Sequence, residues 1–195
     1  MEILFATSNK NKVAEANEVG RRHGIVFTQI HLLYPEIRSD SVAEVAKAGV
    51  EHVHGEIRKP VIVEDSGLFI TALNDFPGAY SHFVFERIGN KGILKLMEGV
   101  ENREARFVSA VAYCEEKDAR SRLMNVNYST PKIFEGVVEG KITAGERGDK
   151  GFGYDPIFKP KGYAKTFAED MKMKSEASHR KIAFENFCKW ITGKA

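Results

Sequence analysis

Two adjacent carboxylates, Glu64 and Asp65, directly follow an apolar run and are the side chains best suited to chemistry. The surrounding stretch, residues 61–70 (VIVEDSGLFI), begins like a strand buried on both faces, and open α/β sheets place ligands at the carboxyl ends of such strands. Paired carboxylates can hold a divalent cation, or one can act as a general base for water. We expect the strand to end at these acids and Ser66 and Gly67 to turn the chain. A purely structural Asp-Ser-Gly turn is the alternative.

A second candidate site is the helix start at residues 7–12, Thr-Ser-Asn-Lys-Asn-Lys. Helix-capping residue types precede a helix expected over residues 10–20. Lys10 and Lys12 lie in its first turn, where cations oppose the helix dipole unless an anion binds. Exposed amides together with lysines suit a phosphate. A solvated basic helix end is the alternative, and the spacing is not that of a Walker P-loop.

The third candidate is a glycine-rich loop over residues 145–155, with a basic helix start further along the chain. So much glycine indicates a backbone that approaches something closely. Phe152 and Tyr154 could flank a flat ring and Asp155 could accept hydrogen bonds from it, or both aromatics could fill the core beneath the loop. Ser178 is a plausible helix cap, and His179 and Arg180 after it form a first turn suited to an electron-rich ligand.

Hydrophobic periodicity predicts the elements that position these residues. We expect a helical pattern over residues 80–98, broken at Gly89 and Gly92, and an antiparallel ribbon or half-open sheet in the later part of the chain. His52 and His54, on the helix that Ser41 caps, are interpreted as surface residues. The other expected strands are 3–6, 25–30, 104–114, 122–128 and 132–142, and the other expected helices are 41–57 and 178–191.

Composition limits the class of protein. A chain of 195 residues with 43% hydrophobic residues fits a single domain, or one domain with two lobes around a cleft. The net charge of +2 does not argue for a nucleic-acid polymer or a membrane surface as partner. Two distant cysteines indicate neither a disulfide framework nor a zinc site. The sequence contains no apolar run of the roughly 18 residues that a span needs and no signal peptide, so we expect a cytoplasmic protein.

Several short motifs, in a fixed order along nearly the whole chain, resemble one enzyme family. They are residues 5–12 (FATSNKNK), 35–36 (PE), 63–68 (VEDSGL), 76–81 (FPGAYS), 151–158 (GFGYDPIF), 166–169 (TFAE) and 178–180 (SHR). The chain in this respect resembles the inosine/xanthosine triphosphate pyrophosphatases, which hydrolyse non-standard purine nucleoside triphosphates such as ITP, dITP and XTP to the monophosphate and pyrophosphate. The resemblance implies an elongated α/β fold, a mixed sheet with flanking helices and two lobes around a central cleft, usually as a homodimer.

The resemblance also implies roles for individual residues. Asp65 matches the general base, and Glu36 matches a carboxylate that binds Mg²⁺, with Glu64 and Asp65 as further metal ligands. The positions that match triphosphate-binding residues are Thr7, Asn9 and Lys12, and those that match the phosphate and ribose end are Ser66, Gly67 and Ser81. The positions that match the pocket for the base are Phe152, Tyr154, Asp155, Lys174, His179 and Arg180.

Two alternatives remain open from the sequence. One is a related pyrophosphatase that acts on other modified or on standard triphosphates. The other is a non-enzymatic nucleotide- or RNA-binding module, which predicts binding that falls steeply with salt and no magnesium-dependent turnover. The density of carboxylates near the candidate site disfavours a groove for a polyanion.

Overall fold

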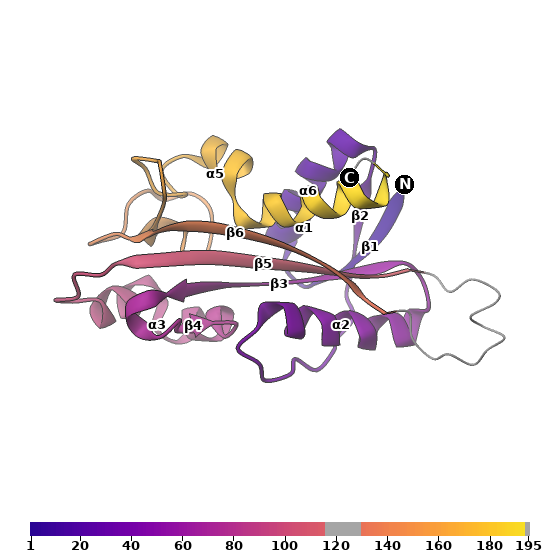
Figure 1. Ribbon diagram of the computed structural model, residues 1–195, viewed down its shortest axis with the longest axis horizontal. Helices are drawn as coiled ribbons and strands as arrows, with labels where there is room; N and C mark the ends of the chain where they lie inside the picture. Colours follow the sequence, from indigo (N-terminus) through magenta and orange to yellow (C-terminus); the bar gives the residue numbers. More distant parts are fainter. Residues whose placement is uncertain (116–129, 194–195) are drawn as a thin grey trace.

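The computed structural model describes residues 1–115 and 130–193. A mixed seven-stranded sheet in the order β2-β1-β3-β5-β6-β7, with β4 also paired to β3, forms the centre of an elongated α/β molecule (Figure 1). The strands are β1 (Glu2–Ala6), β2 (Val26–Ile30), β3 (Val61–Ile70), β4 (Pro77–Gly78), β5 (Glu104–Cys114), β6 (Lys132–Ile142) and β7 (Phe158–Pro160). The strand predicted at residues 122–128 lies outside the described residues.

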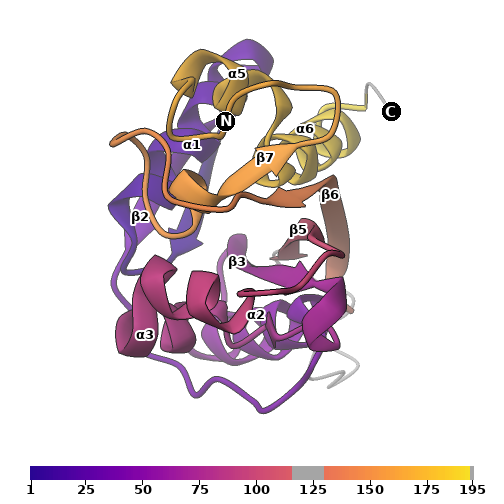
Figure 2. The same ribbon diagram turned by 90° about the vertical axis from the view of Figure 1, so that its left-hand side faces the viewer.

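Helices cover both faces of this sheet, as Figure 2 shows. Helices α1, α5 and α6 lie on one face, and α2 and α3 lie on the other. Their bounds are α1 (Lys10–Gly20), α2 (Val42–Ile57), α3 (Ser81–Leu96), α5 (Met171–Ala177) and α6 (His179–Ile191), with short 3₁₀ turns at Arg21–His23, Thr71–Leu73 and Asp155–Ile157. The expected strands and helices within the described residues are therefore present, whereas β4, β7 and α5 were not predicted.

The ends of the helices follow local sequence rules. Asn9 caps α1, and Ser41 and Ser178 cap α2 and α6 by accepting hydrogen bonds from backbone N–H groups in the first turn. The break expected at Gly89 is a kink within α3, where this glycine has φ +58° and ψ −164°. The interpretation of His54 as a surface residue was wrong, because its side chain is 5% exposed on the buried side of α2.

Strand β3 differs from the prediction in the way that matters most for the site. The chain does not turn at Ser66 and Gly67, because β3 continues to Ile70 and pairs residue by residue with β5 over its whole length. The antiparallel ladder with β5 supplies partners for the backbone that a turn would have supplied locally. Glu64 and Asp65 therefore lie in the middle of a central strand.

Alternation along β3 sends its side chains to opposite faces of the sheet. Ile62 packs in a core cluster with residues of α1 and α6, whereas Val61 and Val63 pack in a cluster with α2. Further along, Leu68 and Ile70 join a third cluster that contains residues of α3 and of the segment after β6. The two acids, which are neighbours in sequence, consequently face different surroundings.

Candidate active site

A gap in strand pairing opens the site beside β3. β1 pairs with β3 only at Val61 and Ile62, and β4 pairs with it only at Leu68 and Phe69, so this edge of residues 63–67 has no strand partner in the described sheet. A cleft of about 780 Å³ opens there. Every site residue predicted from the sequence lines it: Thr7, Asn9, Lys12, Glu36, Glu64, Asp65, Ser66, Gly67, Ser81, Phe152, Tyr154, Asp155, Lys174, His179 and Arg180.

Glu64 points to the face that carries α1 and α6, and protein groups surround its carboxylate. Ser109 Oγ donates to Glu64 Oε1 over 2.6 Å and Arg180 Nε donates to the same oxygen over 3.1 Å. Lys12 Nζ lies 2.9 Å from Glu64 Oε2. Burial alone would raise the pKa of Glu64, but Arg180, Lys12 and the Ser109 hydroxyl outweigh burial and lower it to about 2. Glu64 is therefore an ionised group: Oε1 accepts two hydrogen bonds, whereas Oε2 is ion-paired to Lys12 and accepts no hydrogen bond from the described residues.

Asp65 is in the opposite situation. Burial raises the pKa of Asp65 to about 7, and the nearby negative charges of Glu64 and Glu36 add to that effect, although Lys12 opposes it. Its Oδ2 atom is buried and accepts no hydrogen bond from the described residues. A carboxylate that is poorly partnered, faces a cleft and titrates near neutrality has the properties of a general base.

The first turn of α1 forms one end of the cleft. Asn9 Oδ1 accepts from the N–H groups of Asn11 and Lys12 over 2.9 and 3.4 Å, and Thr7 Oγ1 accepts from the N–H of Asn9. Lys12 Nζ also donates to the Glu64 carbonyl oxygen over 3.1 Å. Glu64 thus already offsets the cation at this helix start, a partner that the local sequence did not indicate. The ammonium group is held at the edge of the cleft, 17% exposed, where an anion can reach it.

From this end of the cleft to the other, buried and partly buried charges of alternating sign form a continuous series that we call the charge chain. The successive ion-pair distances, from Lys12 Nζ to Asp155 Oδ2, are 2.9, 3.1, 2.7, 2.8 and 2.7 Å. Its members, in order, are Lys12, Glu64, Arg180, Glu15, Lys174 and Asp155. Buried ions persist in a protein only when each has opposite charges around it, as here.

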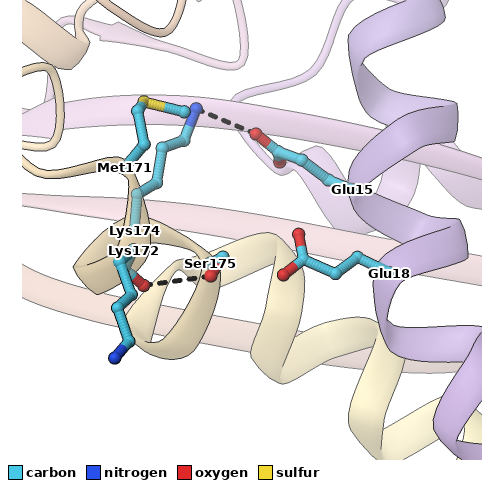
Figure 3. A pocket seen from close by; sticks show the side chains of 6 residues that line it. All are labelled: Glu15, Glu18, Met171, Lys172, Lys174 and Ser175. Carbon is cyan, nitrogen blue, oxygen red and sulfur yellow. Dashed lines mark hydrogen bonds and ion pairs between the residues drawn. The ribbon is translucent and has the colours of Figure 1, made fainter.

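Lys174 and Arg180 are the cationic donors of the other end of the cleft. Figure 3 shows Lys174 of α5 reaching across to Glu15 of α1, beside a separate cavity of about 390 Å³. The Phe152 ring lies under both cations, 4.1 Å from Lys174 Nζ and 5.6 Å from Arg180 Cζ. Of the five N–H donors of Arg180, three are used by Glu64, Glu15 and Ser66. The guanidinium therefore keeps donors for a ligand.

Asp155 holds the glycine-rich loop in place. Its Oδ2 atom accepts from Phe152 N over 2.8 Å and from Lys174 Nζ over 2.7 Å. Gly151 has φ +77°, and a Cβ atom there would collide with the Asp155 carboxylate. Only glycine lets this loop close around the carboxylate, so the high glycine content does reflect a close approach.

The two aromatic residues of the loop separate into different environments. Phe152 lies in the cleft, whereas the Tyr154 ring is 4% exposed and packs edge-on against Phe85 at 5.2 Å. The Tyr154 hydroxyl donates to the Ser81 carbonyl oxygen over 3.0 Å. The ring of Tyr154 thus fills the core, the second of the two options, although Tyr154 also lines the cleft, and its contact with a ligand stays a prediction.

Ser81 and Gly67 also have clear structural tasks. Ser81 Oγ accepts from Leu68 N and donates to the Gly78 carbonyl oxygen, both over 2.7 Å. A Cβ atom on Gly67 would collide with that same Gly78 carbonyl. These contacts hold the start of α3 against β3.

His179 contributes a neutral ring. It stacks on Phe107 at 4.5 Å with an angle of 8° between the planes. Burial, reinforced by the positive charge of Arg180, lowers the pKa of His179 to about 3. Its Nδ1 atom is buried and has no hydrogen-bond partner among residues 1–115 and 130–193. An uncharged imidazole of this kind can donate or accept one hydrogen bond.

Glu36, Glu64 and Asp65 are the carboxylates predicted to bind Mg²⁺, and all three line the cleft. No cluster of three or more His, Cys, Asp or Glu side chains suited to a metal is formed by the part of the chain that the structure describes. The exposed Glu36 and the unpartnered oxygen of Asp65 nevertheless fit this ion, which commonly binds one or two carboxylates together with substrate phosphates and waters. Glu64 fits less well, because all its contacts are to cations and a hydroxyl.

Comparison with known proteins agrees with this geometry. The model of the Ham1 family matches residues 3–190. The chain belongs to the Ham1 family. Among relatives of the family, a dITP/XTP pyrophosphatase of Methanopyrus kandleri is 48% identical over 97% of this chain and 96% of its own length. One of Methanosarcina mazei is 43% identical over 100% and 99%.

Solved structures of Ham1 proteins have the same fold. A HAM1 protein from Coxiella burnetii superposes with a TM-score of 0.82 at 31% identity, covering 99% of both chains. The Ham1 protein of Staphylococcus aureus gives a TM-score of 0.80 at 27% identity over the full length of both chains. The mixed α/β architecture with flanking helices is thus the Ham1 fold.

Two residues of this Ham1 site were missed by sequence reasoning. Glu15 joins Lys174 to Arg180, and Ser109 orients Glu64 from the neighbouring strand β5. Glu15 lies three residues after Lys12, a spacing that places both on one side of a helix and could have identified it. Ser109 faces Ser66 across the β3–β5 ladder, and only strand register, which the sequence does not provide, reveals it.

Proposed function

We propose that the protein is a nucleoside triphosphate pyrophosphatase that hydrolyses dITP, ITP and XTP to the monophosphate and pyrophosphate, and so removes them from the nucleotide pool. The observation that carries this proposal is the position of Asp65. It is a buried, poorly partnered carboxylate with a pKa of about 7, and it lines the same cleft as Lys12, Lys174 and Arg180. Relatives named dITP/XTP pyrophosphatase support it.

In this proposal Asp65 accepts a proton from a water molecule next to the α-phosphorus. A bond forms between the water oxygen and the α-phosphorus, and the bond from that phosphorus to the bridging oxygen of the β-phosphate breaks, so that pyrophosphate leaves. Lys12, with the polar groups of Thr7 and Asn9, holds the anionic tail in line for this displacement. Ser66 and the backbone at Gly67 line the segment between the tail and the sugar.

Mg²⁺ is the metal that the donor set suits, with Glu36 and Asp65 as its protein ligands. When bound, it would neutralise charge on the phosphate oxygens. Glu36 is exposed at the edge of the cleft, so a metal that arrives with the triphosphate can reach it without rearrangement of the core. Removal of divalent ions with EDTA should abolish turnover, and added Mg²⁺ should restore it.

Base selectivity follows from the donors at the other end of the cleft. Inosine and xanthosine carry a 6-oxo group, whereas adenine carries a 6-amino group. The remaining N–H groups of Lys174 and Arg180 and the neutral ring of His179 would pair with the oxygen and leave an amino group facing donors. A mispaired buried polar group costs about 1–3 kcal/mol, which corresponds to roughly tenfold to a hundredfold rejection of ATP.

A substrate panel tests the proposal. The purified protein with Mg²⁺ should release pyrophosphate from dITP, ITP and XTP with kcat/KM at least about tenfold above that for ATP. Inorganic phosphate as the product would contradict attack at the α-phosphorus. Comparable turnover of ATP would favour a pyrophosphatase of broader range. Steeply salt-dependent RNA binding without turnover would favour a binding module.

We further propose a homodimer, a single domain of two lobes and a cytoplasmic location. Within residues 1–115 and 130–193, no helix is long and apolar enough to span a membrane. Light scattering coupled to size-exclusion chromatography would measure the mass, for which a dimer predicts twice the 21.8 kDa of the chain.

A further inference from the structure

The charge chain has one member that contacts both ends of the cleft. Glu64 binds Lys12, the cation of the proposed phosphate end, and Arg180, a cation of the proposed base end. Its side chain is fully buried, so bulk water does not screen these two interactions. Glu15 also binds two cations, but both of them, Lys174 and Arg180, belong to the base end.

Charged and polar groups surround the carboxylate of Glu64. One carboxylate oxygen accepts from Ser109 and Arg180 and the other faces Lys12, which also donates to the Glu64 carbonyl. The strand that carries it is paired with β5 throughout its length, so the carboxylate stays where the ladder places it. A fixed anion shared by two cations makes the two cations dependent on each other.

We propose that Glu64 is a positioning residue that couples phosphate binding at Lys12 to base recognition at Arg180. The proposal rests on the function proposed above. An anion that binds Lys12 weakens the pair between Lys12 and Glu64, which leaves Arg180 as the main cationic partner of Glu64. Arg180 is then held more firmly in one orientation, with its free N–H groups directed into the cleft. Binding at one end therefore favours binding at the other.

Two fragments of the substrate can measure this coupling without turnover. Pyrophosphate carries the anion and inosine carries the base, and together they contain less than the nucleotide, so they can bind at the same time. Isothermal titration calorimetry, in EDTA, gives the affinity for inosine with and without saturating pyrophosphate. We expect the wild-type protein to bind inosine about fivefold more tightly when pyrophosphate is present, which lies at the lower end of typical couplings between sites.

Substitution of Glu64 should remove the coupling. In Glu64→Gln the shared charge is lost while the shape is kept, and the inosine affinity should change less than about 1.5-fold on addition of pyrophosphate. Ser109→Ala keeps the charge but removes the hydroxyl that orients it, and should reduce the coupling partially. The matched control is Glu104→Gln, an exposed acid at the start of β5, which should keep the full coupling. A merely structural role of Glu64 would change both affinities without changing their ratio.

Each result has a defined meaning. Coupling in Glu64→Gln equal to that of the wild type, or no coupling in the wild type, would overturn the proposal. If Glu64→Gln keeps the coupling but needs more than about ten times the wild-type Mg²⁺ concentration for turnover of dITP, Glu64 is a metal ligand instead. If Glu64→Gln fails to fold, Ser109→Ala decides. Turnover of dITP by a wild type without coupling would overturn only the role of Glu64, whereas failure to bind either fragment would overturn the proposed function as well.

Discussion

The two faces of strand β3 place neighbouring acids in opposite states. On the face that carries α1 and α6, Glu64 meets Lys12, Arg180 and Ser109, and its pKa falls to about 2. One residue later, Asp65 meets burial and further negative charge, and its pKa rises to about 7. The same functional group thus becomes a permanent anion on one face and a titratable group on the other.

The difference shows that one strand can carry an acid that positions other groups directly beside an acid that exchanges a proton. A carboxylate between two cations stabilises both of them and is hard to protonate. A carboxylate with an unpartnered oxygen is costly to keep charged, which makes it a competent proton acceptor near neutral pH. Because side chains alternate along a strand, adjacent positions are enough to create both environments.

The strongest way to break this comparison is Asp65→Asn. The amide cannot accept a proton from water, so we expect kcat for dITP to fall at least about a thousandfold while nucleotide binding is kept, as for the loss of a general base. Pyrophosphate release and calorimetric binding would be measured on the same preparation. Substantial residual activity would remove Asp65 from the role of base.

Direct titration would sharpen the comparison further. In the metal-free protein, carboxyl ¹³C NMR should show Asp65 titrating at about 7 while Glu64 remains ionised down to about 2. Added Mg²⁺ should lower the midpoint of Asp65, because a nearby positive charge favours the ionised form. A midpoint of Asp65 near its ordinary value of 3.8 would show that this face of β3 does not raise the pKa of its acid.

The same contrast predicts a gain in stability from an inactivating change. The folded state raises the pKa of Asp65, so its contribution to stability is present below the unfolded pKa and is lost as the pH rises through about 7. At about pH 8, Asp65→Asn removes a buried charge and should raise the free energy of unfolding by up to about 4 kcal/mol, because folding raises this pKa from 3.8 to about 7. Metal-free urea denaturation at about pH 8 and pH 4 would test this, since the gain should shrink in acid.

The smallest expected effects separate the aromatic residues of the loop. Phe152→Ala removes the ring beneath Lys174 and Arg180 and should raise KM for dITP about tenfold, with little change in stability. Tyr154→Phe removes the hydrogen bond to Ser81 and should lower the free energy of unfolding by about 1 kcal/mol, with KM unchanged. The reverse pattern would mean that Tyr154, and not Phe152, meets the base.

Local sequence was sufficient for much of the fold, and family motifs for a set of residues that line one cleft. Helix caps at Asn9, Ser41 and Ser178 follow from residue type alone, and hydrophobic periodicity located the strands that became β5 and β6. The family motifs then identified residues that line one cleft in the structure. These features depend on short-range patterns, which a single sequence contains.

What could not be predicted depends on partners distant in sequence. The Asp-Ser-Gly sequence after Glu64 favours a turn, but pairing with β5 keeps those residues in the strand. The cation of Lys12 at a helix start suggested an anion as ligand, and local sequence did not indicate that Glu64, 52 positions away, is ion-paired to it. Ser109 and the burial of the Tyr154 ring likewise follow from strand register and packing, which local propensity does not determine.

The extension of β3 through the cleft has a consequence for how this protein could change. Asp65 stands on a strand that is paired with β5 along its whole length, whereas Phe152 belongs to a loop that side-chain contacts hold in place, among them those of Asp155 and Asn90. Evolution or engineering can thus rebuild the wall that meets the base while the reacting centre stays in register. New substrate ranges should arise by replacing that loop, and grafts between relatives at residues 145–155 are the natural place to look for them.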